Sequence, residues 1–169
     1  MFKNSSKFMQ NEYEEKLRDY IKNNNINAEQ LFFDNLVDHG ENVLKTIKEK
    51  NIDFNDIIKT IVFIDLDKNI EYGNGVIGIV PANSRVNKDK LKSHCKSRIK
   101  IASSEQVLIL TSYPAGGVPP FGFKARFYLD KTLINKNAVY AGGGSIRTLI
   151  KTTIKEVLKD TKADIVDIL

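Results

Sequence analysis

The sequence predicts an α+β fold, with a mixed, mostly antiparallel β-sheet or barrel-like core and short helices packed around it. Short runs rich in β-branched residues, such as residues 57–64, outnumber the segments with helical spacing. The 169 residues contain no internal repeat and no interdomain linker. A chain of this length is typical of a single domain.

Composition limits the class of protein. Hydrophobic residues make up 41% of the chain, so a core can form without disulfide or metal staples. With Cys95 as the only cysteine and two histidines, an internal disulfide, a multi-cysteine zinc site and a histidine-rich metal centre are excluded. No apolar run approaches the roughly 18 residues of a membrane span, and the first residues are too polar for a secretory signal. We therefore expect a cytoplasmic protein that uses no metal or cofactor and does not contact a membrane.

The first part of the chain combines two helices and a strand. A helix is predicted at about residues 10–22, where apolar side chains recur at steps of three and four. Three consecutive asparagines at residues 23–25 end it, because asparagine favours turns over helix interiors. A short strand at residues 30–33 and a second amphipathic helix at about residues 38–50 follow.

From residue 57 the pattern changes to that of strands. The run at residues 57–64 is almost continuously apolar, as in a strand buried on both faces. Residues 105–110 are apolar enough for either a strand or a helix, and the capping box of Ser103 and Gln106 favours the helix. The other expected elements are strand 76–80 closed by Pro81, a short helix with Leu91 and Cys95 inward, strands 125–129, 138–140 and 146–150, helix 154–160 capped by Thr153 with Glu156, and strand 164–168.

Two features imitate known chemical motifs. Residues 73–78 match the glycine spacing of a dinucleotide-binding loop, but that loop must open a helix, and here Pro81 follows. We interpret this run as a glycine-kinked strand. Cys95 adjoins His94, but neighbours in sequence do not face each other on a helix, so we interpret Cys95 as a small core residue.

Charge is unevenly distributed along the chain. Residues 1–80 carry a net charge of −4 and residues 81–169 carry +9. A basic block, residues 85–100, holds most of this excess, in Arg85, Lys88, Lys90, Lys92, Lys96, Arg98 and Lys100 against Asp89. Local positive charge of this density attracts phosphates, although a solvated helix face has the same composition.

The glycine–proline loop, residues 113–123, is the most unusual segment. It holds three glycines and three prolines in eleven residues. Glycine permits close approach of the backbone to a ligand, and proline restricts the conformations of the loop. Exposed N–H groups of such a loop form a cradle for an oxyanion, with Tyr113, Val118 and Phe121 as walls of a small pocket. A purely structural loop is the alternative, and residues 142–144 form a second glycine cluster that faces the same pocket or only turns the chain.

Lys59 interrupts an otherwise apolar strand. Removing its ammonium group from water is costly, so the side chain either reaches solvent at the strand end or faces a cleft. Next to the polar Thr60, it is a candidate for binding a phosphate or an ester carbonyl.

Four segments occur in an order that resembles the YbaK family of aminoacyl-tRNA deacylases, which is similar to the editing insertion domain of bacterial prolyl-tRNA synthetases. They are Lys-Thr-Ile-Val at residues 59–62, Gly-Gly-Val-Pro-Pro-Phe-Gly at 116–122, Tyr-Leu-Asp at 128–130 and the glycines at 142–144. The resemblance covers about residues 25–168. It divides the chain into an N-terminal helical extension, residues 1–24, and an editing domain, residues 25–169.

The resemblance implies a trans-editing hydrolase that cleaves the ester of a mischarged tRNA, with the aminoacylated acceptor end as partner and a synthetase as a further candidate. A water, or the thiol of a cysteine substrate, attacks, so no protein side chain is the nucleophile. Within this resemblance, the threonine at position 60 favours the branch of the family that is specific for Cys-tRNA(Pro) or a related small amino acid. Residues 143–145 depart from that branch, which usually has an arginine near the glycine.

The expected site residues follow from the loop composition and from this resemblance. The expected catalytic residues are Lys59, Gly116 and Gly117. The expected substrate contacts are Thr60, Tyr113, Val118, Pro119, Phe121, Gly122, Asp130, Gly142, Gly143 and Gly144. The expected tRNA contacts are Arg85, Lys88, Lys92 and Lys96. Two other functions stay open: a non-catalytic tRNA-binding module of the same fold, and an enzyme of small nucleotides that uses residues 73–78.

Overall fold

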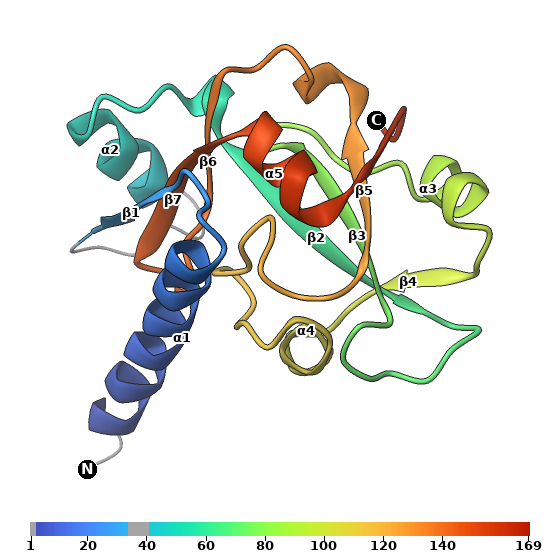
Figure 1. The fold of residues 1–169 in the computed structure, drawn as a ribbon, viewed down its shortest axis with the longest axis horizontal. Coiled ribbons are helices and arrows are strands. Elements are labelled where there is room, and N and C mark those ends of the chain that lie inside the picture. The colour runs from blue at the N-terminus through green and yellow to red at the C-terminus, as the bar shows by residue number, and fades with distance from the viewer. Residues whose placement is uncertain (1–2, 34–40) are drawn as a thin grey trace.

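The computed structural model describes residues 3–33 and 41–169, with side chains described from residue 12 to 33 and from residue 44 onwards (Figure 1). The elements in chain order are α1 (Lys3–Asn23), β1 (Glu29–Phe32), α2 (Glu41–Glu49), η1 (Phe54–Asp56), β2 (Ile58–Asp65), β3 (Gly75–Pro81), α3 (Lys88–Cys95), β4 (Ile99–Ile101), α4 (Ser104–Thr111), β5 (Arg126–Asp130), η2 (Lys131–Leu133), β6 (Ala138–Gly142), β7 (Thr148–Thr153), α5 (Ile154–Thr161) and β8 (Asp164–Val166).

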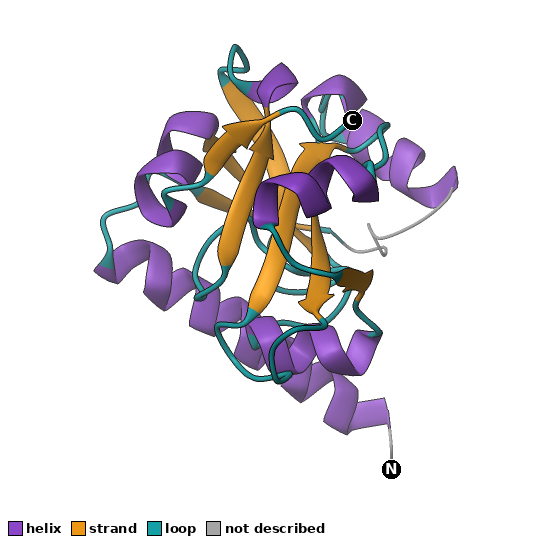
Figure 2. Ribbon diagram, turned by 90° about the vertical axis from the view of Figure 1, so that its right-hand side faces the viewer, coloured by secondary structure: helices purple, strands orange, loops and turns teal. Residues whose placement is uncertain are grey.

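The larger sheet has five strands in the order β4-β2-β3-β5-β8. The pairs β4–β2 and β2–β3 are antiparallel, whereas β3–β5 and β5–β8 are parallel. The central strands β2 and β3 are the apolar runs of the sequence, and helices cover both of their faces (Figure 2).

The smaller sheet has three antiparallel strands in the order β1-β7-β6. A parallel bridge between Ile57 and Tyr140 joins it to the beginning of β2. The α+β class with a mixed, mostly antiparallel sheet is confirmed. Among the described residues the two sheets stay open and do not close into a barrel.

Side-chain alternation along β2 divides the core. Ile58, Val62 and Ile64 pack into the main cluster, which includes Leu17 of α1, Leu110 of α4 and Val157 of α5. On the opposite face, Ile61 and Phe63 pack with Leu91 and Cys95 of α3. A third cluster, around Ile47 of α2 and Phe33, lies beside Ile57 and Tyr140. Lys59 therefore belongs to the face that carries Ile57 and Ile61, and Thr60 to the face of the main cluster.

Most predicted elements are present with ends shifted by a few residues. The Ser103–Gln106 capping box starts α4, and the Thr153 hydroxyl caps α5 by accepting from the Glu156 amide. Residues 75–81 form β3, which leads into a turn, so the dinucleotide-type glycine pattern opens no helix. Cys95 is buried in α3 as a core residue.

The differences concern the shortest and the terminal elements. Strand β4 was not predicted, because three residues are too few to show a period. Helix α1 begins at Lys3, well before the predicted residue 10, and Leu17 packs it firmly on the main core. The predicted start of the second helix, residues 38–40, lies outside the described residues. The domain boundary after residue 24 stays a prediction. Among the described residues, no helix combines the length and the apolarity needed to cross a bilayer.

Candidate functional site

Two glycine-rich segments dock directly on each other. The glycine turn, residues 142–145, packs against the glycine–proline loop, and the Gly144 amide donates a 2.8 Å hydrogen bond to the Gly117 carbonyl. A Cβ atom on Gly117 would lie 2.6 Å from the Ser145 amide nitrogen, and one on Gly142 would overlap the Val118 carbonyl. These two glycines are required because the backbones approach more closely than any side chain allows. The structure therefore brings together the two glycine clusters that the sequence singled out.

The strand that carries Lys59 begins beside the strand that leads into the glycine turn. The Ile57–Tyr140 bridge is parallel, so Lys59 and Gly142, each two residues further on, run along adjacent strands in the same direction. The Lys59 side chain is half-buried, and it has no ion-pair partner among the described residues. Burial, followed by the positive charge of Arg85, lowers the pKa of Lys59. An unpaired, partly desolvated cation of this kind is prepared to bind an anionic or strongly polar group.

The free donors of the loop are on either side of Gly117. The Gly117 amide is occupied, since it donates to the Pro114 carbonyl at 3.0 Å. The amides of Gly116 and Val118 have no acceptor in the part of the chain that the structure describes. Gly116 is exposed with φ +84°, and Val118 is largely buried. The oxyanion cradle predicted for this loop thus has two candidate N–H donors. Gly117 is not one of them, and its contribution is to let the loop pack closely on the glycine turn.

Thr60 does not share a face with Lys59. It pairs with Ile79 in the β2–β3 register and belongs with the main core. Its hydroxyl oxygen is buried without a hydrogen-bond partner among the described residues. Adjacent strand residues point to opposite faces, so the Lys59–Thr60 pair cannot present both side chains to one ligand surface.

Four other predicted contacts are buried in the structure. Tyr113 and Phe121 are fully buried in the main core, and Gly122 packs near Tyr20 of α1. Asp130 is 1% exposed, and both of its carboxylate oxygens are used: one accepts from the amide and hydroxyl of Thr132, the other from the Ile168 amide. The substrate contacts of Tyr113, Phe121, Gly122 and Asp130 stay predictions. We infer a structural role for Asp130, because its carboxylate is buried and both of its oxygens are occupied. Pro119 is also buried, next to Val118.

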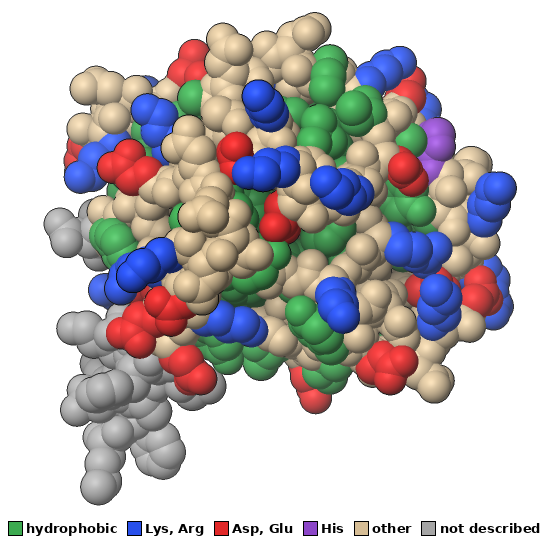
Figure 3. All heavy atoms as spheres, in the orientation of Figure 1, with side chains coloured by type: hydrophobic (Ala, Val, Ile, Leu, Met, Phe, Trp, Pro, Cys, Tyr) green, Lys and Arg blue, Asp and Glu red, His purple; other side chains and the backbone are tan. Residues whose placement is uncertain are grey.

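The basic block is divided by its ion pairs. Lys90 binds Asp167 at 2.7 Å, Arg98 binds Asp67 at 2.8 Å, and Lys92 lies 3.6 Å from Asp89. The remaining cations have no ion-pair partner among the described residues: Arg85, Lys88, Lys96 and Lys100. Figure 3 shows Lys and Arg side chains, with some acidic ones, on the side of the molecule where α3 and β4 lie. Among these residues, Arg85 is close enough to Lys59 for its positive charge to help lower the pKa of Lys59.

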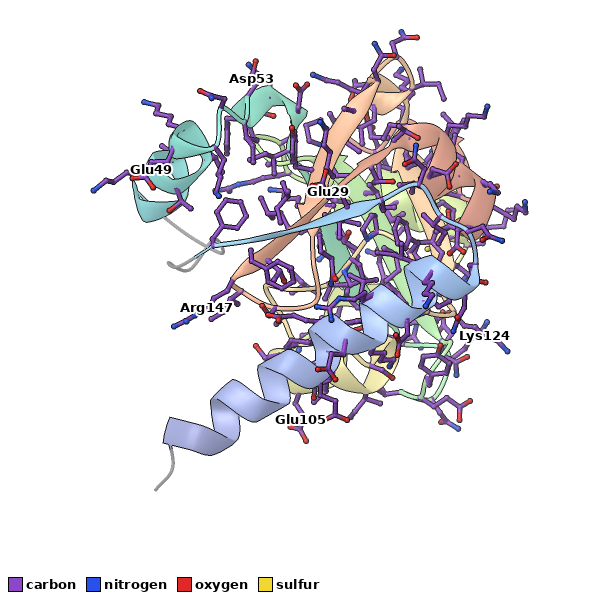
Figure 4. The ribbon with its side chains drawn as sticks, turned by 60° about the vertical axis from the view of Figure 1, so that its left-hand side comes forward. Glu29, Glu49, Asp53, Glu105, Lys124 and Arg147 are labelled. Atoms are coloured by element: carbon purple, nitrogen blue, oxygen red, sulfur yellow. The ribbon has the colours of Figure 1, made fainter. Side chains whose placement is uncertain are left out.

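Two residues near the glycine turn were missed by the sequence analysis. The buried Glu14 of α1 accepts a 2.6 Å hydrogen bond from the Ser145 hydroxyl. The sequence does contain a sign of this role. Glu14 lies at helical spacing from Leu17 and Ile21, so a carboxylate stands within the apolar face of the helix. Arg147 is exposed in the turn that leads into β7, near the end of β1, and no motif marked it (Figure 4).

Comparisons with known proteins concern the family and the fold of the chain. A family description, the aminoacyl-tRNA editing domain, matches residues 38–159, well over half of the chain. No protein with a curated description matches the sequence. The crystal structure of a hypothetical protein is similar, with 23% identity, a TM-score of 0.77 and coverage of 90% of this chain and 98% of the other. A second crystal structure, of a protein proposed to be a trans-editing enzyme for prolyl tRNA synthetase, has 22% identity, a TM-score of 0.79 and coverage of 92% and 96%. At these identities the solved structures establish the shared fold.

Proposed function

The chain belongs to the aminoacyl-tRNA editing domain family, and on this premise we propose that it hydrolyses the ester between a wrongly attached amino acid and the terminal adenosine of a tRNA. One observation carries the proposal beyond family membership. The glycine turn docks on the loop with the free amides of Gly116 and Val118, and it ends the strand that the Ile57–Tyr140 bridge joins to the beginning of β2, two residues before the unpaired Lys59.

The chemistry needs an electrophilic carbonyl, a water and a place for developing negative charge. A water attacks the ester carbonyl carbon, and the carbonyl oxygen gains negative charge in the transition state. The amides of Gly116 and Val118 are suited to stabilise that oxygen, since N–H donors fixed by the fold do not need to reorganise. The ribose oxygen then leaves with a proton, which releases the free amino acid and the tRNA.

Lys59 has a positioning role in this proposal. Its ammonium group binds the terminal nucleotide or the ester, and its partial burial makes the interaction stronger than it would be in bulk water. Arg85 extends the positive potential from Lys59 towards α3, and Lys88, Lys92 and Lys96 continue it along the helix. The acceptor arm of a tRNA, a dense array of phosphates, fits a surface of this charge.

The finer specificity is also a proposal. We propose a small amino acid on tRNA(Pro), with cysteine as the first candidate. The fold shared with the protein proposed to edit for prolyl tRNA synthetase supports this choice, as does the threonine at position 60. A prolyl-tRNA synthetase is the corresponding candidate partner, and the cytoplasm the corresponding location.

A deacylation assay over a panel of mischarged tRNAs tests the proposal. The purified chain is incubated with Cys-, Ala-, Ser- and Pro-tRNA(Pro), and released amino acid is measured together with the binding of uncharged tRNA. We expect turnover of at least one mischarged species and little turnover of Pro-tRNA(Pro). Binding of all species without release of amino acid would show a non-catalytic tRNA-binding module, and neither binding nor release would remove tRNA as the substrate.

A further inference from the structure

A second cavity, distant from Lys59, is lined by aromatic residues. The tyrosine pocket has a volume of about 370 Å³ and is formed mainly by Tyr20, Tyr72, Phe123, Phe127 and Asp160. Tyr72 lies in the connection between β2 and β3, at the opposite end of these strands from Lys59. The pocket is large enough for a small organic ligand.

The polar groups of the tyrosine pocket are electronegative. Asp160 contributes a carboxylate and lies in the last turn of α5. Tyr20 lies in the last turn of α1, so two helix C-termini with their partly negative carbonyl groups adjoin the pocket. The Tyr20 hydroxyl donates a 2.8 Å hydrogen bond to Asp160, and burial with this bond raises the pKa of Tyr20 to about 12. Tyr20 therefore keeps its proton and holds the carboxylate in place.

A buried acceptor without a partner lies against the same wall. The Tyr113 side chain is fully buried, and its hydroxyl has no hydrogen-bond partner among the described residues. That hydroxyl is 3.5 Å from the position that a Cβ on Gly122 would take, and Gly122 lines the pocket. The Tyr72 oxygen, which accepts from the Lys124 amide at 3.2 Å, completes the set of phenol oxygens.

We propose that the tyrosine pocket binds an alkylammonium group. A carboxylate, helix C-termini and phenol oxygens attract a cation with N–H donors, and the faces of aromatic rings add cation–π attraction. The same groups repel phosphate, so the pocket is unsuited to a nucleotide. Among the described residues, the one cation on its wall is Lys124, which is exposed beside the C-terminal end of α1 (Figure 4). The site does not depend on the proposed hydrolysis, because it shares no residue with the Lys59 site.

A matched pair of probes separates charge from shape. Pentylamine and 1-pentanol have the same chain length and differ in their charged or neutral head group. Each is titrated into the full chain at constant ionic strength, and backbone amide chemical shifts are followed by NMR. We expect pentylamine to bind about tenfold more tightly than 1-pentanol, with the largest shifts at Gly122 and in the last turn of α5.

Variants test the two parts of the site. We expect Asp160→Asn to remove most of the difference between the two probes, and Tyr72→Leu to weaken pentylamine binding about fivefold. Asp164→Asn, an exposed carboxylate at the start of β8, is the matched control and should leave binding unchanged. Equal affinity for both probes, unchanged binding in both variants, or preferential binding of adenosine monophosphate would overturn the proposal.

The source of the ammonium group needs a separate comparison. Spermidine represents a free polyamine, and the peptide Gly-Lys-Gly represents a lysine side chain of a partner protein. Tighter binding of spermidine identifies a free amine as the ligand, and tighter binding of the peptide identifies a lysine. Either result supports the proposed ammonium site, whereas binding of neither contradicts it.

Discussion

The Ser145 hydroxyl donates a 2.6 Å hydrogen bond to Oε1 of Glu14, and this contact joins the first helix to the glycine turn. The backbones are also close there, because a Cβ on Gly144 would lie 3.0 Å from the Tyr13 carbonyl oxygen. Ser145 further donates its amide to the Thr148 hydroxyl, which fixes the turn from its other side. Helix α1 thus forms the wall behind the loops of the candidate site.

Substitutions of Ser145 and of Glu14 are expected to lower the free energy of unfolding by different amounts. Ser145→Ala leaves the Glu14 carboxylate buried without its hydroxyl partner, and we expect a loss of about 2–3 kcal/mol in the free energy of unfolding. Glu14→Gln keeps an acceptor for Ser145, so its loss is expected to stay near 1 kcal/mol, roughly one hydrogen bond to a charged group exchanged for a neutral one. Chemical denaturation of both variants checks this order, and equal losses would show that the buried charge is not what makes the contact important.

Lys59 is the residue on which the proposed hydrolysis depends most. We expect Lys59→Ala to lower deacylation by about 10²–10³, because a charged contact to the transition state is lost. The fold should persist, since the ammonium group is only half-buried and unpaired. Lys155→Ala, an exposed lysine of α5, is the control of equal chemistry and should keep full activity. A Lys59→Ala variant that is folded and as active as the control would remove Lys59 from the mechanism.

Gly117 tests packing rather than catalysis. A Cβ at Gly117 meets the backbone of Ser145, which cannot rotate away, so we expect Gly117→Ala to cost about 1–3 kcal/mol of stability. Gly116→Ala places an alanine at φ +84° on an exposed loop and should cost about 1–2 kcal/mol through the backbone alone. The thermal midpoints of both variants are to be measured before any activity is interpreted. A Gly117→Ala protein with an unchanged midpoint would contradict the close docking of the two loops.

The free cations of the basic block should control tRNA affinity. The pair Lys88→Glu and Lys96→Glu is expected to raise KM for aminoacyl-tRNA with little change in kcat, because both side chains are exposed and unpaired. The dependence of log affinity on log salt should become shallower by about one for each phosphate contact removed. Lys155→Glu makes the same change of charge on α5 and is the control. It should alter neither KM nor the salt dependence. An unchanged KM and salt dependence would identify the block as a solvated face.

Asp167 is expected to make the free energy of unfolding depend on pH in the acidic range. Hydrogen bonds from Lys131 and Lys90 lower the pKa of Asp167 to about 2, from an ordinary value of 3.8. A carboxylate with a lowered pKa stabilises the fold above its unfolded value, and this contribution is lost as the pH falls through the folded value. We therefore expect Asp167→Asn to flatten the fall in stability between pH 3.8 and about 2, measured by denaturation at several pH values. Asp164→Asn is the control, and the same flattening there would show that the two lysines are not the cause.

The sequence by itself determined the class of fold and most of the elements. Continuous β-branched runs are typical of buried strands, and side-chain oxygens before an apolar run cap helices, as Ser103 does for α4. Both are local effects that depend on neighbours along the chain. The same is true of the choice of Lys59 and the two glycine clusters, since an ammonium in an apolar strand and a run of glycines are conspicuous wherever they occur.

The tertiary structure alone decided which of these residues meet and what the glycines do. The sequence placed Thr60 beside Lys59, but strand alternation sends it into the main core. It also placed Tyr113 and Phe121 on the walls of a pocket, whereas both are fully buried in the main core. The contact of Gly117 with Ser145, and that of Ser145 with Glu14, join residues far apart in the chain. Such contacts depend on how helices and sheets pack in three dimensions, and the periodicity of a single sequence does not contain that information.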